Sequence, residues 1–402
     1  MRVLFSCVPG YGHLHPMVPV ARALQGAGHA VAFATETRFC ARVRAAGFEA
    51  FPAGLGPGVV ARRTFELPEV AALGPDGHWR FGALMFAAVA APAKAPDLRG
   101  LVRSFGADLL VTDVTDFAGP VAAAGAGIPW VAHSLGPLFP LEFFQRSAEL
   151  LEPLWRSVGL EPGPLGGMFR YGYLDICPAT LQSDEAAAAA PTSVPVRPVP
   201  FDAVAGEGLP AWVDGLDPDR PTVYVTLGTL DNCAEGVLEA AVEGLRNEAV
   251  EVVVTVGPDR DPAELGPQPP HVHVERYLPQ SLLLGRCHVV VAHGGSGTML
   301  ASLVEGLPML VLPQGANQFW NAERCEALGL GRRLVAGAVT AEAVRGEVRL
   351  LLDDPSYRER ARSVAAEIAA MPAPAASVTV LERLVASEPG ALAGAPGGPP
   401  TR

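Results

Sequence analysis

Six consecutive residues in the second half of the chain have the types and spacing of an anion-binding site. Residues 293–298 read His-Gly-Gly-Ser-Gly-Thr. They stand between a continuous apolar run at 289–292 and a segment whose apolar residues recur with helical spacing. The pattern predicts a strand, a glycine turn and a helix. Because glycines let backbone N–H groups approach an oxyanion and a helix N-terminus favours negative charge, this stretch predicts a phosphate-binding turn.

Amide side chains follow the next predicted strand, residues 309–312. The loop at 313–318 reads Pro-Gln-Gly-Ala-Asn-Gln, and an Asn-Ala pair follows at 321–322. In an open parallel sheet the carboxyl ends of the strands face one crevice, where ligands bind. We therefore expect Asn317 and Gln318 to contact a ligand rich in hydroxyl groups.

A histidine and an aspartate in the first third of the chain could transfer a proton. His13 follows the first predicted strand, residues 3–8, and Asp113 ends another strand, residues 108–113. An imidazole can accept a proton from an attacking hydroxyl near neutral pH, and a carboxylate on its other nitrogen would stabilise the imidazolium. The alternative is that both side chains only cap helices. His15 and Asp116 are neighbours of the same residue types.

Three patterns could suggest a metal site. Asp-x-Asp triplets occur at 217–219 and 259–261, and His-x-His occurs at 271–273. The triplets lie in proline-flanked loops, where turn-forming aspartates are common, and the two histidines have no third ligand near them in the sequence. We interpret the triplets as turns and the histidines as surface of an edge strand, and predict no metal.

The elements that must carry these residues alternate between strands and helices. Predicted strands at 3–8, 29–35 and 48–52 enclose helices, which is typical of a parallel α/β sheet. Residues 10–12 read Gly-Tyr-Gly, but His15 stands where a dinucleotide fingerprint has its third glycine, so a nicotinamide site is disfavoured. Further strands are predicted at 108–113, 128–131, 222–227, 252–256, 272–275, 289–292 and 309–312.

Together these motifs resemble the donor-binding signature of family 1 glycosyltransferases. The resemblance rests on the 293–298 turn, the Gly-x-Pro at 306–308, the 313–318 loop with its Asn-Ala pair, and Gly-His-x-x-Pro at 12–16. It implies the GT-B fold, in which two facing Rossmann-like, doubly wound parallel-sheet domains enclose a cleft. The implied divisions are an acceptor domain at 1–205, a linker at 206–220, a nucleotide-sugar domain at 221–370, a helix at 371–387 packing back on the first domain, and a disordered tail at 388–402.

The same resemblance implies an inverting, metal-independent transfer of a sugar from a nucleoside diphosphate to an acceptor hydroxyl. His13 would be the base and Asp113 its partner. The residues implied for the donor diphosphate are Gly228, Thr229, His293, Gly294, Gly295, Ser296, Gly297 and Thr298, and those for the nucleobase are Tyr277, Leu278 and Gln280. The bacterial branch that modifies natural products, including antibiotics, is the most similar.

Two departures from the family pattern bear on the donor. Asn317 replaces the usual Asp before Gln318, and Ala301 stands where many relatives have a Glu for the ribose hydroxyls. Loss of that acceptor suits a deoxyribose, so we expect a dTDP-deoxysugar. The alternatives are a UDP-sugar transferase acting on a lipid or a flavonoid-like acceptor, and a catalytically silent homologue that binds nucleotide sugar.

Aromatic residues gather at about 65–90 and 138–173. Such surroundings suit a hydrophobic aglycone such as a polyketide, although aromatic residues are more often core. The candidate acceptor contacts are Trp79, Met85, Phe139 and Phe143.

Composition excludes several classes of protein. A net charge of -12 without a basic stripe argues against nucleic acid as a partner. The 6 cysteines form no Cys-x-x-Cys pair, which indicates reduced thiols and a cytoplasmic location. No apolar run is long enough for a membrane span. We expect a monomer or a homodimer whose only partners are nucleotide sugar and aglycone, with no cofactor.

Overall fold

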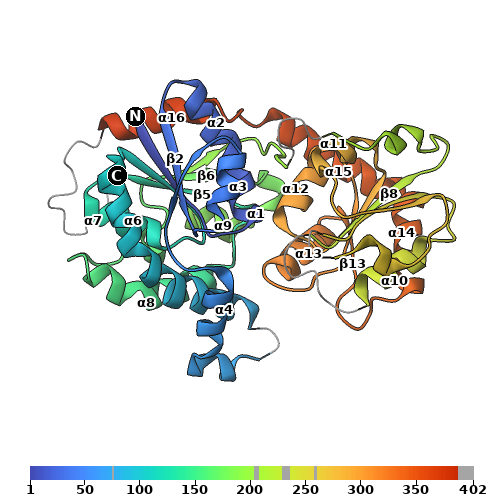
Figure 1. Cartoon of the computed structure of the whole chain (residues 1–402), viewed down its shortest axis with the longest axis horizontal. Coiled ribbons are helices and arrows are strands. Elements are labelled where there is room, and N and C mark those ends of the chain that lie inside the picture. The colour runs from blue at the N-terminus through green and yellow to red at the C-terminus, as the bar shows by residue number, and fades with distance from the viewer. Residues whose placement is uncertain (75–76, 203–207, 229–235, 258–259, 388–402) are drawn as a thin grey trace.

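The chain forms two α/β domains (Figure 1). The structure, a computed structural model, describes residues 1–74, 77–202, 208–228, 236–257 and 260–387. The first domain has a 7-stranded sheet in the order β3-β2-β1-β4-β5-β6-β7, and the second a 6-stranded sheet in the order β10-β9-β8-β11-β12-β13. Every strand pairing is parallel. The predicted fold class is confirmed.

The strands of the first sheet are β1 (Arg2–Ser6), β2 (Ala30–Thr35), β3 (Glu49–Pro52), β4 (Leu109–Asp113), β5 (Trp130–His133), β6 (Tyr173–Asp175) and β7 (Ser193–Pro195). Those of the second are β8 (Thr222–Thr226), β9 (Glu251–Thr255), β10 (Val272–Glu275), β11 (Val289–Ala292), β12 (Met309–Val311) and β13 (Gly331–Arg333). The central strands are buried on both faces, which is why they are continuous apolar runs rather than alternating ones.

The helices of the first domain are α1 (Tyr11–Leu14), η1 (His15–Met17), α2 (Val18–Gly26), α3 (Cys40–Ala45), α4 (Pro57–Phe65), η2 (Pro68–Ala72), α5 (His78–Ala83), the π-helix η3 (Leu84–Ala90), α6 (Ala91–Phe105), α7 (Ala118–Ala126), α8 (Leu141–Arg156), η4 (Pro164–Gly167), η5 (Ala179–Leu181) and α9 (Asp184–Ala189). Those that follow are η6 (Ala211–Gly215), α10 (Val237–Leu245), η7 (Pro262–Leu265), α11 (Gln280–Leu283), η8 (Leu284–Arg286), α12 (Ser296–Val304), α13 (Gln318–Ala327), α14 (Ala341–Asp353), α15 (Pro355–Ala370) and α16 (Ala376–Ser387).

Strand order places the predicted functional residues at equivalent points of the two domains. In the first sheet β1 lies between β2 and β4, and in the second β8 lies between β9 and β11. The chain therefore reverses its direction of winding between β1 and β4 and between β8 and β11. Ligands bind at such switch points, outside the carboxyl ends of the strands.

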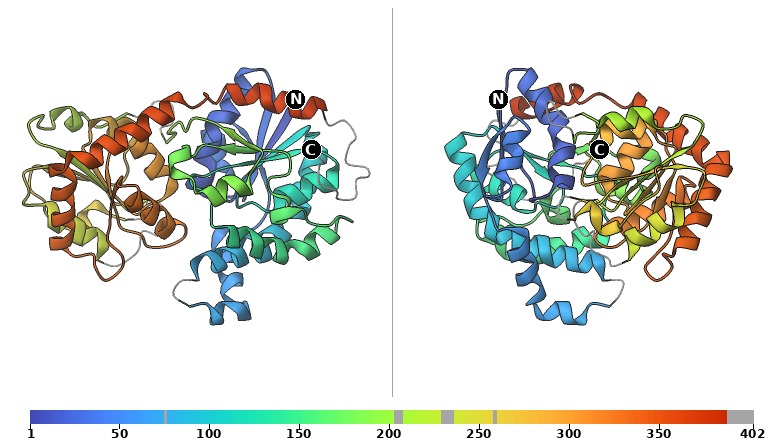
Figure 2. Two further views of the ribbon diagram at one scale, coloured as in Figure 1. Left: turned by 180° about the vertical axis from the view of Figure 1, so that it is seen from behind. Right: turned by 45° about the vertical axis from the view of Figure 1, so that its right-hand side comes forward.

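The last helix leaves the second domain and returns to the first. Figure 2 shows α16 beside α2 of the first domain. His29 Nε2 lies 2.9 Å from Glu382 Oε1, and the Arg197 N–H donates to the Pro372 carbonyl over 2.7 Å. Of the helix predicted at 371–387, the structure has α16 from Ala376 to Ser387, packed against α2 of the first domain, and residues 371–375 are not helical. The predicted tail at 388–402 lies outside the described residues.

Several local predictions need correction. The strand predicted at 128–131 is displaced to 130–133, and the Gly-His-x-x-Pro turn is itself helical, because α1, η1 and α2 follow one another without interruption. The short strands β6, β7 and β13 were not predicted, since three residues are too few for a periodic signal. Within the described ranges, no helix combines the length and apolarity needed to cross a bilayer.

Candidate active site

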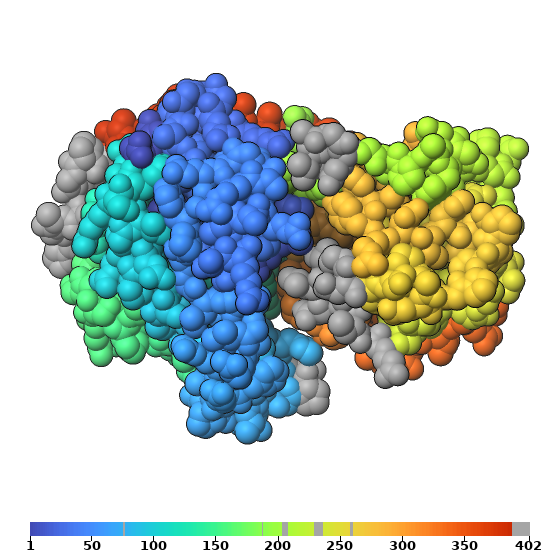
Figure 3. All heavy atoms as spheres, in the orientation of Figure 1, coloured from blue at the N-terminus to red at the C-terminus, as the bar shows by residue number. Residues whose placement is uncertain are grey.

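A cleft of about 530 Å³ lies between the domains and is lined by residues of both. The hollow is visible in Figure 3 between the first domain and the second. A volume of this order is typical of sites for small organic ligands. The walls come from the β1–α1 segment, the segment at 198–202, the ends of β8 and β9, residues 276–280, the start of α12 and the 316–318 loop.

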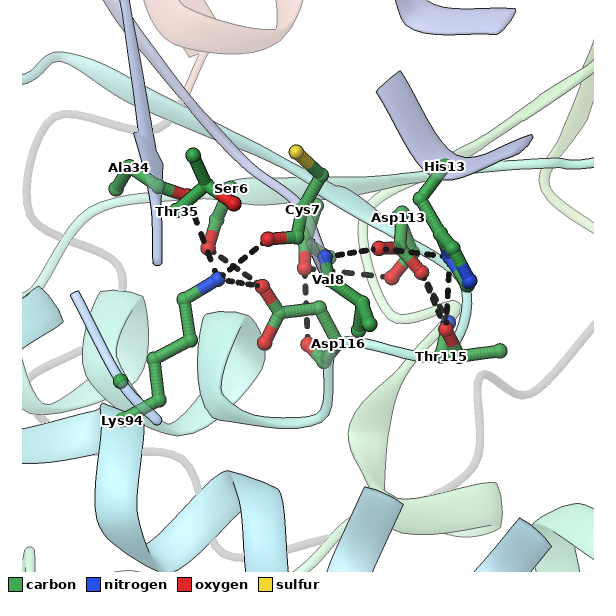
Figure 4. Close-up of polar contacts among 12 residues, drawn as sticks. Ser6, Cys7, Val8, His13, Ala34, Thr35, Lys94, Asp113, Thr115 and Asp116 are labelled. Atoms are coloured by element: carbon green, nitrogen blue, oxygen red, sulfur yellow. Dashed lines mark hydrogen bonds and ion pairs between the residues drawn. The ribbon is translucent and has the colours of Figure 1, made fainter. Parts of the chain in front are cut away.

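His13 and Asp113 meet at the switch point of the first sheet (Figure 4). Nδ1 of His13 lies 3.3 Å from Oδ2 of Asp113. The carboxylate is fully buried, while the imidazole keeps 19% of its side-chain surface exposed and lines the cleft. Since Nδ1 faces the carboxylate, Nε2 is the ring nitrogen left to accept a proton from a substrate.

Backbone and hydroxyl donors hold the Asp113 carboxylate in place. Val8 N–H donates to Oδ2 over 2.7 Å, and Thr115 donates to Oδ1 from its N–H over 2.8 Å and its hydroxyl over 2.6 Å. Burial raises the pKa of Asp113, but the His13 ring and these donors outweigh burial and hold the pKa below its ordinary value. The carboxylate is therefore ionised at neutral pH and can stabilise an imidazolium at His13.

His293 is enclosed at the switch point of the second sheet. A Cβ on Gly228 would lie 2.7 Å from its Nε2, and a Cβ on Gly295 would lie 2.4 Å from the same atom. Burial lowers the pKa of His293 to about 4, against the opposing effect of the Thr226 carbonyl. The ring is thus neutral at pH 7, so any interaction with a ligand would be a hydrogen bond rather than that of a cation.

The N-terminus of α12 opens onto the cleft. Gly295 is its N-cap residue, and the N–H groups of Ser296, Gly297 and Thr298 belong to the first turn, where no helical carbonyl is available to them. All four residues line the cleft. Gly294 has φ +88°, and a Cβ there would lie 2.6 Å from Val311 Cγ1, so the turn needs glycine for conformation and for packing. This geometry suits a diphosphate.

The amide loop is tied to the same helix. Asn317 Nδ2 donates to Ser296 Oγ over 2.9 Å, and Asn321 Nδ2 donates to the Gly294 carbonyl over 2.8 Å. Gln318 Oε1 accepts from the N–H groups of Gln314, over 2.8 Å, and Gly315, over 3.1 Å. The loop is thereby fixed beside the phosphate turn, with Asn317 and Gln318 in the cleft wall.

Residues 276–280 form another part of the wall. Tyr277 is 45% exposed, and its hydroxyl donates to the Asp202 carbonyl over 2.5 Å. Leu278 is buried beneath it, and Gln280 Oε1 accepts from the Thr298 hydroxyl over 3.3 Å. Leu278 and Gln280 line the cleft with Tyr277, next to the phosphate turn and where a nucleobase can stack.

The loop after β5 joins the two domains at the phosphate turn. Gly136 of the first domain has φ +154°, and a Cβ on it would lie 2.7 Å from the Ser296 Cβ of the second. Arg324 on α13 donates to the carbonyls of Thr180, Leu181 and Gln182 in the first domain. The two domains are therefore in direct contact, and both sets of predicted site residues face one cleft.

The predicted acceptor contacts are not in this cleft. Phe143 is 1% exposed and packs among other aromatic rings of the core, so its prediction as an acceptor contact is wrong. Trp79 and Phe139 pack on the margin of the same core, and Met85 is half-buried; none of the three lines the cleft. Alternate aromatic residues of a helical segment point in different directions, which composition cannot resolve.

Sequence reasoning assigned no role to several residues in or near the cleft. The Phe86 ring does not line it, but its centroid lies 6.2 Å from that of the His13 ring. Phe201 and His15 do line it, and their rings contact each other edge to face. A chain of hydroxyl groups runs along the floor, from Tyr224 through Thr255 to Thr226. Inward-pointing hydroxyls at the ends of β8 and β9 were a usable signal for this chain. Thr229, predicted beside Gly228, lies outside the described residues.

The metal-like patterns have other roles where they are described. Asp217 accepts from the Asp219 N–H over 3.0 Å, and Asp261 caps η7. His273 stacks on Trp212 at 4.2 Å, and the His271 ring lies 3.1 Å from the Arg246 carbonyl. Among the residues that the structure places, no group of three or more His, Cys, Asp or Glu side chains could hold a metal ion.

Two facing doubly wound domains, with an imidazole–carboxylate pair opposite a helix N-terminus, define the GT-B class of glycosyltransferases. Residues 239–384 match the family model described as Erythromycin biosynthesis protein CIII-like, C-terminal domain. The chain is 35% identical to the L-demethylnoviosyl transferase of Streptomyces niveus, over 96% of this chain and 98% of that one. It is 31% identical to the aklavinone 7-beta-L-rhodosaminyltransferase of Streptomyces galilaeus, over 99% of each.

Solved structures of glycosyltransferases are also similar to this chain. Spinosyn rhamnosyltransferase SpnG complexed with thymidine diphosphate matches with a TM-score of 0.80 and 30% identity, over 95% of this chain and 100% of that one. The glycosyltransferase SnogD from Streptomyces nogalater matches with a TM-score of 0.75 and 31% identity, over 96% and 99%. The chain belongs to this family of antibiotic glycosyltransferases and is a glycosyltransferase.

Proposed function

We propose that this glycosyltransferase moves a deoxysugar from a dTDP-sugar to a hydroxyl group of a hydrophobic natural-product aglycone such as a polyketide, with inversion and without a metal ion. The observation that carries the proposal is the position of the His13–Asp113 pair opposite the N-terminus of α12 in one cleft. It supplies a base on one side of a bound sugar and anion-binding groups on the other. An intact pair also argues against a catalytically silent homologue.

The His13–Asp113 pair accounts for activation of the acceptor hydroxyl. Nε2 of His13 accepts the proton of the acceptor hydroxyl as its oxygen attacks the anomeric carbon, and the ionised Asp113 stabilises the imidazolium at Nδ1. The oxygen–carbon bond forms as the bond from the sugar to the diphosphate breaks on the opposite face. One displacement of this kind inverts the anomeric configuration.

The donor half follows from the phosphate turn. The first-turn N–H groups of α12 and the neutral His293 can donate hydrogen bonds to the oxygens of the leaving diphosphate. These groups are fixed before the reaction, so they stabilise developing negative charge without reorganising. On this proposal they take the role that a divalent cation has in other nucleotide-sugar transferases.

The preference for a thymidine donor rests on Ala301. Its methyl group lines the cleft one turn into α12, where a carboxylate would accept hydrogen bonds from ribose hydroxyls. A deoxyribose does not need that acceptor. The similarity to a structure complexed with thymidine diphosphate supports the same preference. Asn317, an amide in the sugar loop, suits a sugar with fewer hydroxyl groups than hexoses carry.

The aglycone is proposed from the apolar wall near His13. Phe86 lies beside the base, and Leu135, Ile176 and Val199 line the cleft on the side of the first domain. Apolar groups around one polar base suit a large aglycone that presents a single hydroxyl. Since the five described cysteines are unpaired and buried, we place the enzyme in the cytoplasm. We also propose that it is a monomer or a homodimer.

Thermal shift with nucleotides tests the donor site. dTDP should raise the Tm more than UDP, GDP or ADP at equal concentration, with magnesium or with EDTA, and the shift should be lost in His293→Ala. His271→Ala, a histidine outside the cleft, is the matched control and should keep the shift. A larger shift with UDP than with dTDP would contradict the thymidine assignment, and a shift that requires magnesium would contradict metal independence.

A further inference from the structure

Lys94 is the only lysine of the sequence, and it is buried. It lies on α6 at 6% exposure, and its Nζ is 2.5 Å from Oδ2 of Asp116, which is 3% exposed. Its stem packs on Gly54, because a Cβ on that glycine would lie 3.1 Å from the Cβ and Cγ of Lys94. Buried ion pairs contribute little to stability on balance, since both charges lose their hydration.

The ammonium group has three partners, as many as it has protons. Nζ donates to the Cys7 carbonyl over 2.9 Å, to the Ala34 carbonyl over 3.3 Å and to Asp116. These acceptors belong to the carboxyl ends of β1 and β2 and to the loop after β4. One side chain thus ties together three strand ends at the switch point of the first sheet.

One peptide group connects Lys94 to the His13–Asp113 pair (Figure 4). The carbonyl of the Cys7–Val8 peptide accepts from Lys94, and its N–H donates to Asp113 Oδ2 over 2.7 Å. That carboxylate oxygen is the one that lies 3.3 Å from His13 Nδ1. Because a peptide group is planar, fixing its carbonyl fixes the direction of its N–H. A cation on the carbonyl also strengthens the N–H as a donor.

Asp116 balances the ammonium without facing the base. Its Oδ2 also accepts from the Ser6 hydroxyl over 2.6 Å, and its carbonyl accepts from the Thr112 hydroxyl over 2.9 Å. Asp116 is therefore fixed by β1, which precedes the His13 helix, and by β4, which ends at Asp113. An ion pair present only to fill the core would have no such link to the carboxylate.

We propose that Lys94 is a positioning residue for the catalytic base. Its ammonium fixes the Cys7–Val8 peptide, whose N–H holds the Asp113 carboxylate where it orients and stabilises His13. The proposal rests on the proposed function of His13 as base. It predicts that Lys94 affects the rate of the chemical step through Asp113, and that it affects substrate binding little.

The variants must remove the charge without leaving its partner unpaired. Lys94→Met alone would bury an uncompensated Asp116 and could fail to fold. The double variant Lys94→Met/Asp116→Asn removes both charges and keeps an acceptor for Ser6. Trp130→Phe is the matched control, because it removes a buried hydrogen bond to the Gly167 carbonyl, of 3.0 Å, in the same domain but away from the base.

We expect the double variant to lower kcat by about tenfold with little change in either KM. Its effect should largely disappear when Asp113→Asn is already present, since the link to His13 is then broken. Trp130→Phe should lower Tm while leaving kcat nearly unchanged, with or without Asp113→Asn. Equal effects of the double variant in the presence and absence of Asp113→Asn would overturn the proposal.

A spectroscopic measurement on the free protein separates this proposal from the assignment of function. The Nδ1–H resonance of His13 can be recorded on protein labelled with 15N-histidine and assigned by its loss in His13→Gln. We expect it to move in the double variant and to stay in place in Trp130→Phe. An unchanged resonance in the double variant would overturn the proposal, whether or not the protein transfers a sugar. Absence of transfer with a resonance that moves would overturn only the function.

The measurement must account for the other titratable groups around Asp113. These groups are His13 on α1, Asp116 in the loop after β4, His133 on β5 and Cys7 after β1. Burial lowers the pKa of His133 to about 4 and raises that of the Cys7 thiol to about 12. Both groups are therefore uncharged near pH 7, where the resonance should be compared.

Discussion

Nδ1 of His13 lies 3.3 Å from Oδ2 of Asp113, although 99 residues separate the two in the sequence numbering. The contact exists because β1 and β4 are neighbours in the first sheet, so that the residues following their carboxyl ends converge. On the other side of the cleft, β8 and β11 bring Gly228 and His293 together in the same manner. The active site is thus built from two equivalent points of two similar sheets.

Replacement of the base should abolish the chemical step without abolishing donor binding. His13→Ala removes the group that accepts the proton, so kcat should fall by about 10²–10⁴-fold. The Tm shift with dTDP should remain, because His13 lies on the acceptor side of the cleft. His29→Gln is the control, since His29 is paired with Glu382 away from the cleft. Loss of activity in the control, or full activity in His13→Ala, would contradict the assigned role.

Acid should destabilise the protein through its buried histidines. Burial lowers the pKa of His15, His133 and His293 to about 4 each. An unfolded imidazole binds a proton near pH 6.5, so the unfolded state gains protons first as the pH falls. Stability is thus complete above about pH 6.5 and is lost between there and about pH 4. The loss at pH 5 should be about 2 kcal/mol for each ring.

Denaturant unfolding at pH 7 and pH 5 measures this effect. His133→Phe should make the difference smaller by about 2 kcal/mol, because one titrating ring is removed. Asp175 acts in the opposite direction, since burial raises its pKa to about 6 and its folded carboxyl gains a proton first. Asp175→Asn should therefore make the acid loss larger. Equal free energies of unfolding at the two pH values would refute the account.

A methyl group at the interdomain contact should impair donor binding. Gly136→Ala places a Cβ 2.7 Å from the Cβ of Ser296, in a backbone conformation with φ +154° that suits glycine. The phosphate turn or the domain closure must then shift, so KM for the nucleotide sugar should rise by about tenfold. Gly100→Ala, where nothing lies within 4 Å of an added Cβ, is the control. Unchanged kinetics in Gly136→Ala would show that this contact is dispensable.

A carboxylate in place of the Asn317 amide should change which sugar the enzyme prefers. Asn317 donates to Ser296 Oγ, whereas the carboxylate of Asn317→Asp could only accept from that hydroxyl or from the sugar. Donors with more sugar hydroxyl groups should gain relative to deoxysugar donors, by about tenfold in the ratio of kcat/KM. Competition between two dTDP-sugars in one assay measures the ratio. A ratio equal to that of the unchanged enzyme would exclude a role for Asn317 in sugar choice.

The two sheets and the phosphate turn were predictable because their signals are local. Buried parallel strands are continuous apolar runs, and the 293–298 turn combines a strand, glycines and a helix within a few residues. The short strands β6, β7 and β13 lacked that periodic signal. The acceptor wall was predicted least well, since aromatic composition does not distinguish Phe143, which faces the core, from Phe86, which lies beside His13.

The sequence by itself determined the fold class and the family, and it supplied the residue types proposed to transfer a proton and to bind a diphosphate, because each depends on neighbours along the chain. Only the tertiary structure decided which of these residues contact one another. His13 and Asp113 form a pair because β1 and β4 are adjacent, and Ser296 touches Gly136 because the domains close. The link from Lys94 through the Cys7–Val8 peptide to Asp113 joins three elements distant in sequence, and no local pattern encodes it.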